Sequence, residues 1–231
     1  MRVTNPGRAA GLLYLTMILF GAFSLVYVPT KLIVPENATA TASNILASEM
    51  LYRLSIVSGL IAAVAFMFLA RALYGLLNEV NKAHASLMVT LVMISVAIGF
   101  ALTVNDLAAL VVLRGADFLA VFTQSQREAL AMLFLRLGSQ GSLVAQIFWG
   151  LWLFPFGVLV MRSGFLPRIL GVLLIINGAA YVVASFTGLL VPTYASVVNR
   201  IAFIPELGEV WIMLWLLIKG AKVRPSAPAA S

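Results

Sequence analysis

A set of polar side chains within or beside long apolar runs is the part of this chain best suited to chemistry. The set consists of Glu49, Arg53, Asn105, Asp106, Gln146, Glu206 and Glu209. An ionised side chain costs at least about 2.5 to 3.5 kcal/mol at the centre of a membrane helix, so such residues usually pair or line a wet cavity. We therefore treat these residues as a candidate ligand-binding site.

Three kinds of ligand fit this set. Carboxylate and amide oxygens are the ligands that Ca²⁺, Mg²⁺ and Mn²⁺ prefer. The same carboxylates can titrate during proton-coupled or ion-coupled transport. Arg53 can anchor an anionic head group of a lipid or small molecule. Alternatively, Arg53 pairs with Asp106 or a glutamate and Glu206 extends into the membrane interface, and the charges then serve only packing and orientation.

The sequence offers little for enzyme catalysis. Glu206 and Glu209 are three residues apart, as in di-metal helix bundles, but the Glu-x-x-His partner of such bundles is absent. The chain has no cysteine, and His84, its only histidine, is expected to be solvated at the end of a span. Neither Gly-x-Ser-x-Gly nor a Gly-rich phosphate loop occurs. We predict no catalytic residue and no cofactor, and the sequence leaves metal binding open.

The composition places these residues in a membrane protein. Hydrophobic residues make up 62% of the chain and charged residues 10%, whereas about a quarter of a soluble domain is charged. The net charge of +7 comes from basic residues that stand singly at the ends of apolar runs. No basic stripe with interleaved aromatics exists, so we expect membrane lipid as a partner and no nucleic acid.

The apolar runs predict an all-α, polytopic membrane bundle with six transmembrane helices. Each span needs about 20 mostly apolar residues, and the runs lie at about 9–28, 50–76, 85–113, 143–161, 167–190 and 201–218. The first is expected to be a retained anchor, and the third to tilt, protrude or break at Asn105 and Asp106. Residues 1–220 then form a single membrane domain, and residues 221–231 a disordered cytoplasmic tail.

A short amphipathic helix is expected outside the membrane between the third and fourth spans. Charged residues interrupt residues 115–138, so this segment is not a span. Ser125 and Glu128 have the spacing of a capping box. The apolar residues that follow predict a short helix that lies on the membrane surface or supports the fourth span.

Small residues predict a tightly packed hairpin of the fourth and fifth spans. Counting outward from the basic turn at residues 162–168, Gly157 faces Gly171 and Gly150 faces Gly178. The two glycines of each span are seven residues apart, which places them on one helix face and permits close approach. Pro155 should kink the fourth span, and Pro167 suits the first turn of the fifth.

The distribution of basic residues predicts the orientation. The side that holds both termini would carry Arg2, Arg8, Arg71, Lys82, Arg162, Arg168, Lys219, Lys222 and Arg224. The opposite side would carry Lys31, Arg53, Arg114, Arg127, Arg136 and Arg200 on longer loops. The positive-inside rule then places both termini in the cytoplasm, with the protein in the cell (inner) membrane.

This orientation places the whole candidate set in the outer half of the membrane. We therefore expect an outward-facing polar cavity, closed below by the hairpin and the apolar inner halves of the spans. Asn177 and Tyr181 fall near mid-membrane, where a hydrogen bond between helices is the favoured role.

Several motifs resemble a family of prokaryotic multi-span membrane proteins, the domain of unknown function 4386. They are Arg8-Ala9-Ala10-Gly11, Ala47-Ser48-Glu49 with Arg53, Gly150-Leu151-Trp152, and the turn Arg162-Ser163-Gly164-Phe165-Leu166-Pro167-Arg168-Ile169-Leu170-Gly171. The turn is the most specific of these motifs. The resemblance implies a multi-span membrane protein and brings no activity or site with it.

The sequence therefore favours a non-enzymatic membrane protein whose outward-facing cavity binds or passes a small solute, ion or lipid head group. One alternative is a membrane-embedded enzyme that acts on lipid or isoprenoid substrates with a divalent metal held by Asp106, Glu206 and Glu209. Another is an accessory subunit of a membrane transporter or sensor complex.

Overall fold

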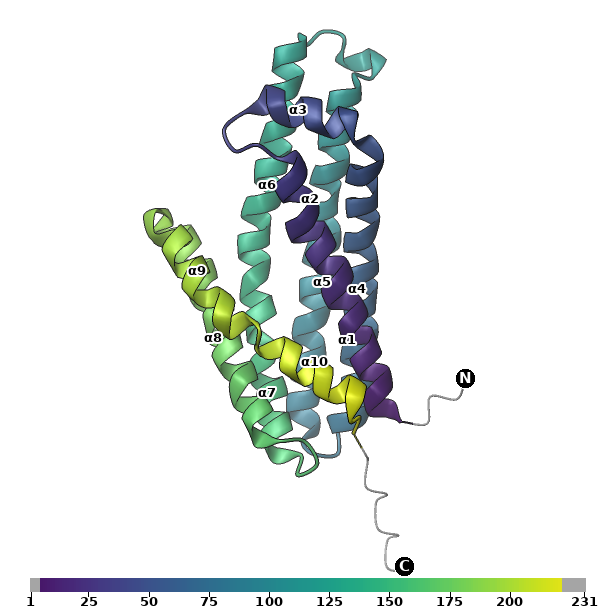
Figure 1. The fold of residues 1–231 in the computed structure, drawn as a ribbon, viewed down its shortest axis with the longest axis vertical. Coiled ribbons are helices and arrows are strands. Elements are labelled where there is room, and N and C mark those ends of the chain that lie inside the picture. The colour runs from purple at the N-terminus through teal and green to yellow at the C-terminus, as the bar shows by residue number, and fades with distance from the viewer. Residues whose placement is uncertain (1–4, 222–231) are drawn as a thin grey trace, which may run out of the picture.

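The computed structural model describes residues 5–221, which form a long column of helices with a hairpin splayed to one side (Figure 1). The elements are α1 (Pro6–Ala22), a π-helical turn (Phe23–Tyr27), α2 (Val28–Leu32), α3 (Ala38–Ala47), α4 (Glu49–Leu77), α5 (Lys82–Arg114), α6 (Gln124–Leu151), α7 (Leu153–Arg162), α8 (Arg168–Leu190), α9 (Ala195–Glu206) and α10 (Gly208–Ile218), with short 3₁₀ turns at Asp117–Leu119 and Pro192–Tyr194. They provide six helices long and apolar enough to cross a membrane, which confirms the predicted all-α polytopic bundle.

The two ends of the column differ, and we name them by what they carry. The terminal end holds both the first and the last described residues. There the backbone amide of Ala221 donates a hydrogen bond of 3.2 Å to Oδ1 of Asn5. Toward the distal end α3 lies across the long helices, and the connection between α5 and α6 extends beyond it (Figure 1). Most of the predicted tail, residues 222–231, lies outside the described residues.

The third span is one unbroken helix. α5 continues through Asn105 and Asp106 without a break. At 1.5 Å per residue its 33 residues extend about 50 Å, against about 30 Å for the hydrocarbon core of a bilayer. The predicted break at Asn105 and Asp106 is therefore wrong, and the two remaining predictions are that the helix protrudes from the membrane or tilts within it.

The predicted short helix between the third and fourth spans is not separate. The capping box is formed by Thr123 and Gln126, two residues before the predicted pair, and α6 then runs unbroken into the fourth span. The helix continues through Gly141. A Cβ at this position would collide with the side chain of Leu102 on α5. This glycine permits close packing between helices, and the short helix outside the spans is α3.

The hairpin of α7 and α8 has the predicted close packing. An added Cβ on Gly157 would lie 2.7 Å from the carbonyl oxygen of Gly171, and one on Gly150 would lie 2.5 Å from that of Gly178. Gly164 in the turn has φ +72°, a conformation that L side chains rarely adopt. The fourth span is interrupted at Trp152, three residues before Pro155, as expected for a proline kink.

The bundle has two apolar cores. The terminal core gathers Tyr14, Leu69, Met88, Trp152, Phe156 and Ile212 among its buried members. The distal core gathers Val28, Ile45, Tyr52, Leu110, Ala131 and Leu135. This division decides the surroundings of each candidate site residue.

Candidate functional site

A buried carboxylate lies in the terminal core. Glu209, in the first turn of α10, is only 9% exposed. Its Oε2 accepts a hydrogen bond of 2.6 Å from the hydroxyl of Tyr14 on α1, and its Oε1 lies 3.4 Å from Nδ2 of Asn177 on α8. Three spans therefore meet at this one carboxyl group.

The sixth span breaks beside this carboxylate. Pro205 has no N–H to donate to the preceding turn, and α9 ends one residue later at Glu206. α10 starts at Gly208, where a Cβ would lie 2.9 Å from the carbonyl oxygen of Leu173 on α8. Nδ2 of Asn177 donates to the carbonyl oxygen of Glu206 at 3.1 Å and so satisfies a backbone group at the break.

Asn177 leaves one oxygen without a partner. The carbonyl of Glu206 and the carboxylate of Glu209 are both acceptors, so the amide must present its NH₂ group to them. Its Oδ1 is fully buried and has no hydrogen-bond partner within the described part of the chain. Oε1 of Gln146, on α6, is likewise buried without a hydrogen-bond partner among the described residues. Buried polar atoms nearly always have a partner, so these two unpaired oxygens require an explanation.

No basic side chain balances Glu209. Among residues 5–221, the ion pairs join Glu49 to Arg53, Glu49 to Arg114, and Glu36 to Arg136, and all lie toward the distal end. The hydrogen-bond partners of Glu209 are instead the hydroxyl of Tyr14 and the amide of Asn177. Within residues 5–221, the carboxyl group of Glu209 therefore has no cationic partner.

The carboxylate lies near the middle of the apolar zone. Trp152, which packs on Tyr14, precedes Arg162 in the basic turn by ten residues, or about 15 Å of helix. That is half of the roughly 30 Å hydrocarbon thickness of a bilayer. Along the helix axis, the level of Glu209 thus lies about half of a hydrocarbon thickness from the basic turn.

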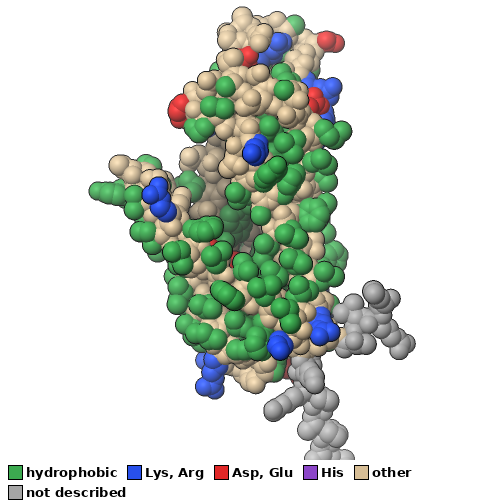
Figure 2. All heavy atoms as spheres, in the orientation of Figure 1, with side chains coloured by type: hydrophobic (Ala, Val, Ile, Leu, Met, Phe, Trp, Pro, Cys, Tyr) green, Lys and Arg blue, Asp and Glu red, His purple; other side chains and the backbone are tan. Residues whose placement is uncertain are grey.

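The space-filling view shows a hollow on this face of the molecule (Figure 2). It lies between the splayed α8–α9 hairpin and the column that contains α1 and α2, with the break between α9 and α10 at its lower edge. Acidic atoms are visible in its depth, within walls that are largely hydrophobic. The break that carries Glu206 and Glu209 therefore borders a recess that opens sideways from the bundle.

A second polar group occurs at the start of α4. Nε of Arg53 donates to Oε1 of Glu49 at 2.7 Å, one turn earlier on the same helix, and Nη1 of Arg114 lies 3.7 Å from the same oxygen. Nearby, the hydroxyl of Tyr52 donates to the backbone oxygen of Asp106 at 3.0 Å. The expectation that Arg53 pairs with a glutamate is confirmed.

The candidate set is divided between two places. Tyr14 and Phe66 both pack on Trp152, so Glu209 lies at the level of Phe66 on α4. Arg53 precedes Phe66 by thirteen residues, or about 20 Å of helix. The prediction of one shared outer cluster is therefore wrong in its arrangement: Glu206 and Glu209 lie at the break, and Glu49, Arg53 and Asp106 lie near the distal end.

The two amides of the set take different positions. Nδ2 of Asn105 donates to the carbonyl oxygen of Leu102 on its own helix. Gln146 precedes Trp152 by six residues and so lies about 9 Å from the Glu209 level toward the distal end. Gln146 is the member of the predicted set that extends the mid-depth site toward the distal side.

The separation removes the basis for a three-carboxylate metal centre. Asp106 contacts Tyr52, the residue before Arg53, and so lies about 20 Å along the helix axis from the level of Glu209. No group of three or more His, Asp or Glu side chains suited to a metal ion occurs among the described residues. Asp106, Glu206 and Glu209 therefore do not converge as the enzyme alternative requires.

Two residues of the site were not in the predicted set. Asn177 was expected to form a hydrogen bond between helices, and its bond to Glu206 confirms that expectation. The sequence indicated this hydrogen bond because Asn177 is a polar amide inside an apolar run. Tyr14 gave no comparable signal, because a single tyrosine in an apolar span usually indicates packing.

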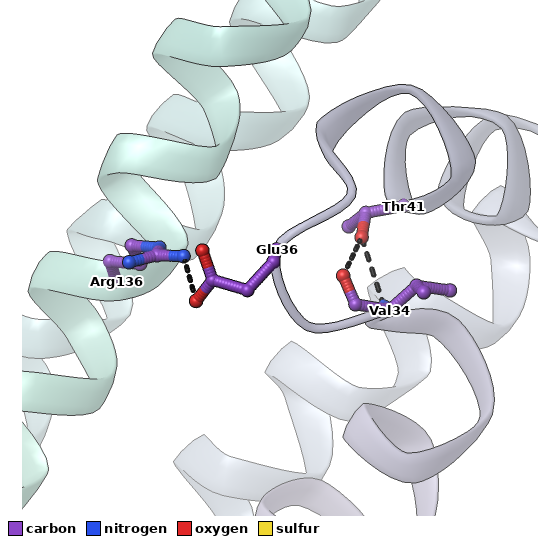
Figure 3. A network of polar contacts seen from close by, with 4 residues as sticks. All are labelled: Val34, Glu36, Thr41 and Arg136. Atoms are coloured by element: carbon purple, nitrogen blue, oxygen red, sulfur yellow. Dashed lines mark hydrogen bonds and ion pairs between the residues drawn. The ribbon is translucent and has the colours of Figure 1, made fainter.

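The distal end has a polar pocket of its own, with a volume of about 490 Å³. Its lining comes from α3 and the start of α6 and includes Ser43, Gln124, Arg127 and Glu128. Figure 3 shows how the segment before α3 is held: Glu36 pairs with Arg136 of α6 at 2.6 Å, and Thr41 bonds the backbone of Val34. A hydrogen bond of 2.6 Å from Thr39 to Glu128 fastens α3 itself. None of the predicted site residues lines this pocket.

Comparison with known proteins places the chain in a family. An uncharacterized protein of the archaeon Archaeoglobus fulgidus is 38% identical over 80 residues, which cover 33% of this chain and 44% of that protein. The chain thus matches less than half the length of this relative, and no solved structure matches it. The family described as Domain of unknown function (DUF4386) matches residues 9–220, nearly the whole chain. The protein therefore belongs to the DUF4386 family, as its turn motif suggested.

Proposed function

We propose that this protein binds a small cation at Glu209 and passes it through the membrane. The observation that carries the proposal is a buried carboxylate at a helix break, beside an unpaired amide oxygen and with no basic partner among the described residues. An ionisable group deep in a membrane protein usually marks an ion or proton pathway. The bound species is a proton or a small metal cation such as Na⁺.

Each residue of the site has a distinct task in this proposal. Glu209 supplies the negative charge, and the hydroxyl of Tyr14 holds its Oε2 in place. Oδ1 of Asn177 supplies a neutral oxygen, while its amide hydrogens fix the break. Discontinuous helices with free backbone groups at mid-membrane are typical of ion-coupled transporters.

The hollow of Figure 2 is the proposed route between the site and one surface. The hollow opens on the side of the bundle. With both termini in the cytoplasm, as the basic residues predict, the proposed route continues from it past Gln146 toward the outside. The proposed cavity is then lined by Gln146, Glu206 and Glu209. Arg53 and Glu49 stand apart from it as a pair near the outer surface.

The test is ligand-dependent stability of the purified protein. Thermal unfolding is measured in chloride salts of Li⁺, Na⁺, K⁺ and choline at one ionic strength, and across pH. A ligand present at about 100 times its Kd stabilises the folded state by about 2.7 kcal/mol. We expect one metal cation to raise Tm above choline in the wild type, or a pH dependence of Tm if the ligand is a proton.

The variant Glu209→Gln should abolish that response while it keeps a hydrogen-bond acceptor for Tyr14. Glu49→Gln is the matched control, because it removes a carboxylate of the distal pair and should leave the response intact. A wild type whose Tm is the same in all salts and whose pH response equals that of Glu209→Gln would contradict the proposal.

A further inference from the structure

An apolar groove lies on the membrane-facing side of α10, between α10 and α8. It has a volume of about 420 Å³ and is lined by Ile169, Leu170, Leu173, Trp211, Leu214, Trp215, Ile218 and Lys219. Lys219 is the one charged residue among them. The groove is separate from the Glu209 site and lies nearer the terminal end.

The two faces of α10 explain how groove and site share one helix. Glu209, Ile212, Met213 and Leu216 are buried against the bundle. Trp211, Leu214, Trp215 and Ile218 follow one another at helical spacing on the other face and line the groove. Trp211 is 58% exposed and Ile218 60%, so residues 5–221 leave this face uncovered.

The mouth of the groove is positively charged. Lys219 stands at the end of α10, and Arg168 begins α8 beside Ile169. No side chain caps the N-terminus of α8, so its first N–H groups are open to an acceptor. Figure 2 shows Lys and Arg side chains at this end of the molecule. Cations and free N–H groups above an apolar groove are complementary to a phosphate on an acyl chain.

We propose that this groove binds one anionic phospholipid, with an acyl chain along Trp211 and Trp215 and the phosphate between Lys219 and Arg168. The lipid then covers the open face of α10, the helix whose opposite face carries Glu209. This site does not depend on the cation proposal, because no residue of the Glu209 cluster lines it.

The test is lipid retention measured by native mass spectrometry. The protein is reconstituted in nanodiscs with equal parts phosphatidylglycerol and phosphatidylcholine, and the lipids that remain bound after release are counted. We expect preferential retention of phosphatidylglycerol. Near an anionic lipid each basic residue contributes about fivefold in affinity, so Lys219→Gln with Arg168→Gln should lower the preference by one order of magnitude or more.

Two further variants separate the groove from general surface charge. Arg200→Gln removes an exposed basic residue of α9 that does not line the groove and should leave the preference unchanged. Leu214→Ala enlarges the groove without changing its charge and should weaken retention of both lipids. The proposal would be overturned by equal retention of the two lipids or by an unchanged preference in the double variant. It would also be overturned if free glycerol phosphate displaced the lipid or if a dimer occupied the groove.

Discussion

The terminal and distal halves of this molecule use the same polar residue types in different ways. At mid-depth, Glu209 is buried and is held by a hydroxyl and an amide, with no ion pair. At the distal side, Glu49 is paired with Arg53 and Arg114 at partly exposed positions. Surface ion pairs contribute little because water screens them, whereas a polar group in an apolar core is costly unless bonded. Depth therefore decides which carboxylate is available for function.

The halves also differ in how closely their helices approach. Toward the terminal end, added Cβ atoms on Gly7, Gly11, Gly157 and Gly171 would collide with backbone atoms of neighbouring helices. On the other side, Gly99 has nothing within 4 Å, and Gly138 meets only a Cβ at 3.7 Å. The helices around the mid-depth site therefore approach one another backbone to backbone, whereas the close approach of α6 to α5 at Gly141 is made to the side chain of Leu102.

The largest difference between the halves should come from glycine substitutions. Gly171→Leu would force its side chain into the backbone of Gly157, and we expect a loss of about 3 kcal/mol or more in the free energy of unfolding. Gly99→Ala should be neutral or stabilising by up to about 1 kcal/mol. Unfolding curves of both variants in one detergent provide the comparison. Equal stabilities would show that the backbone contact between Gly157 and Gly171 contributes little to the stability of the fold.

Asn177→Leu should have the next largest effect. It removes the donor from both the carbonyl oxygen of Glu206 and the carboxylate of Glu209. Leaving buried acceptors unpaired costs about 1 to 3 kcal/mol, so we expect a loss of about 2 to 3 kcal/mol. Asn105→Leu, whose amide bonds only within its own helix, is the distal control and should lose less. A larger loss in the control would reverse the comparison.

Two tyrosines permit a matched test of hydroxyl groups. Tyr14→Phe removes a 2.6 Å bond to the carboxylate of Glu209, and Tyr52→Phe removes a 3.0 Å bond to a backbone oxygen. Hydrogen bonds to charged groups contribute about 1.5 to 3 kcal/mol and neutral ones about 1 kcal/mol. Tyr14→Phe should therefore be the more destabilising in thermal or denaturant unfolding. Equal losses would indicate that Glu209 is neutral in the folded protein without ligand.

The smallest effect should come from the exposed pair at the distal end. Side chains of Arg136 and Glu36 are 53% and 83% exposed, so Arg136→Gln should leave Tm close to the wild-type value at physiological salt. The measurement is repeated at low and high salt, because screening weakens such pairs. A large drop in Tm would mean that the α3 segment depends on this pair.

The six-span bundle could be predicted from the sequence because the hydrophobic runs are long and are separated by polar segments. The glycine hairpin could be read as well, because Gly150, Gly157, Gly171 and Gly178 fall at matching distances from one turn. The pairing of Glu49 with Arg53 follows from their spacing of four residues. Each of these features depends on residues that are close in sequence or related by one turn.

The depth of the acidic site could not be read, because the sixth span was assigned to residues 201–218. The apolar segment instead extends over Pro192–Ile218 and bends at Leu207, so Glu206 and Glu209 fall in its middle. Tyr14 comes from the first span, and contacts between distant parts of the chain leave no local pattern. The arrangement of the site thus depended on helix packing in three dimensions.

The most direct test of the central claim is cation flux through Glu209 in sealed proteoliposomes. Proton and sodium movements are followed with a pH-sensitive dye and with radioactive sodium, for the wild type, Glu209→Gln and Glu49→Gln. The account predicts flux of one of these cations in the wild type and in Glu49→Gln, and none above empty liposomes in Glu209→Gln. Flux that persists in Glu209→Gln, or a wild type that passes neither cation, would contradict it.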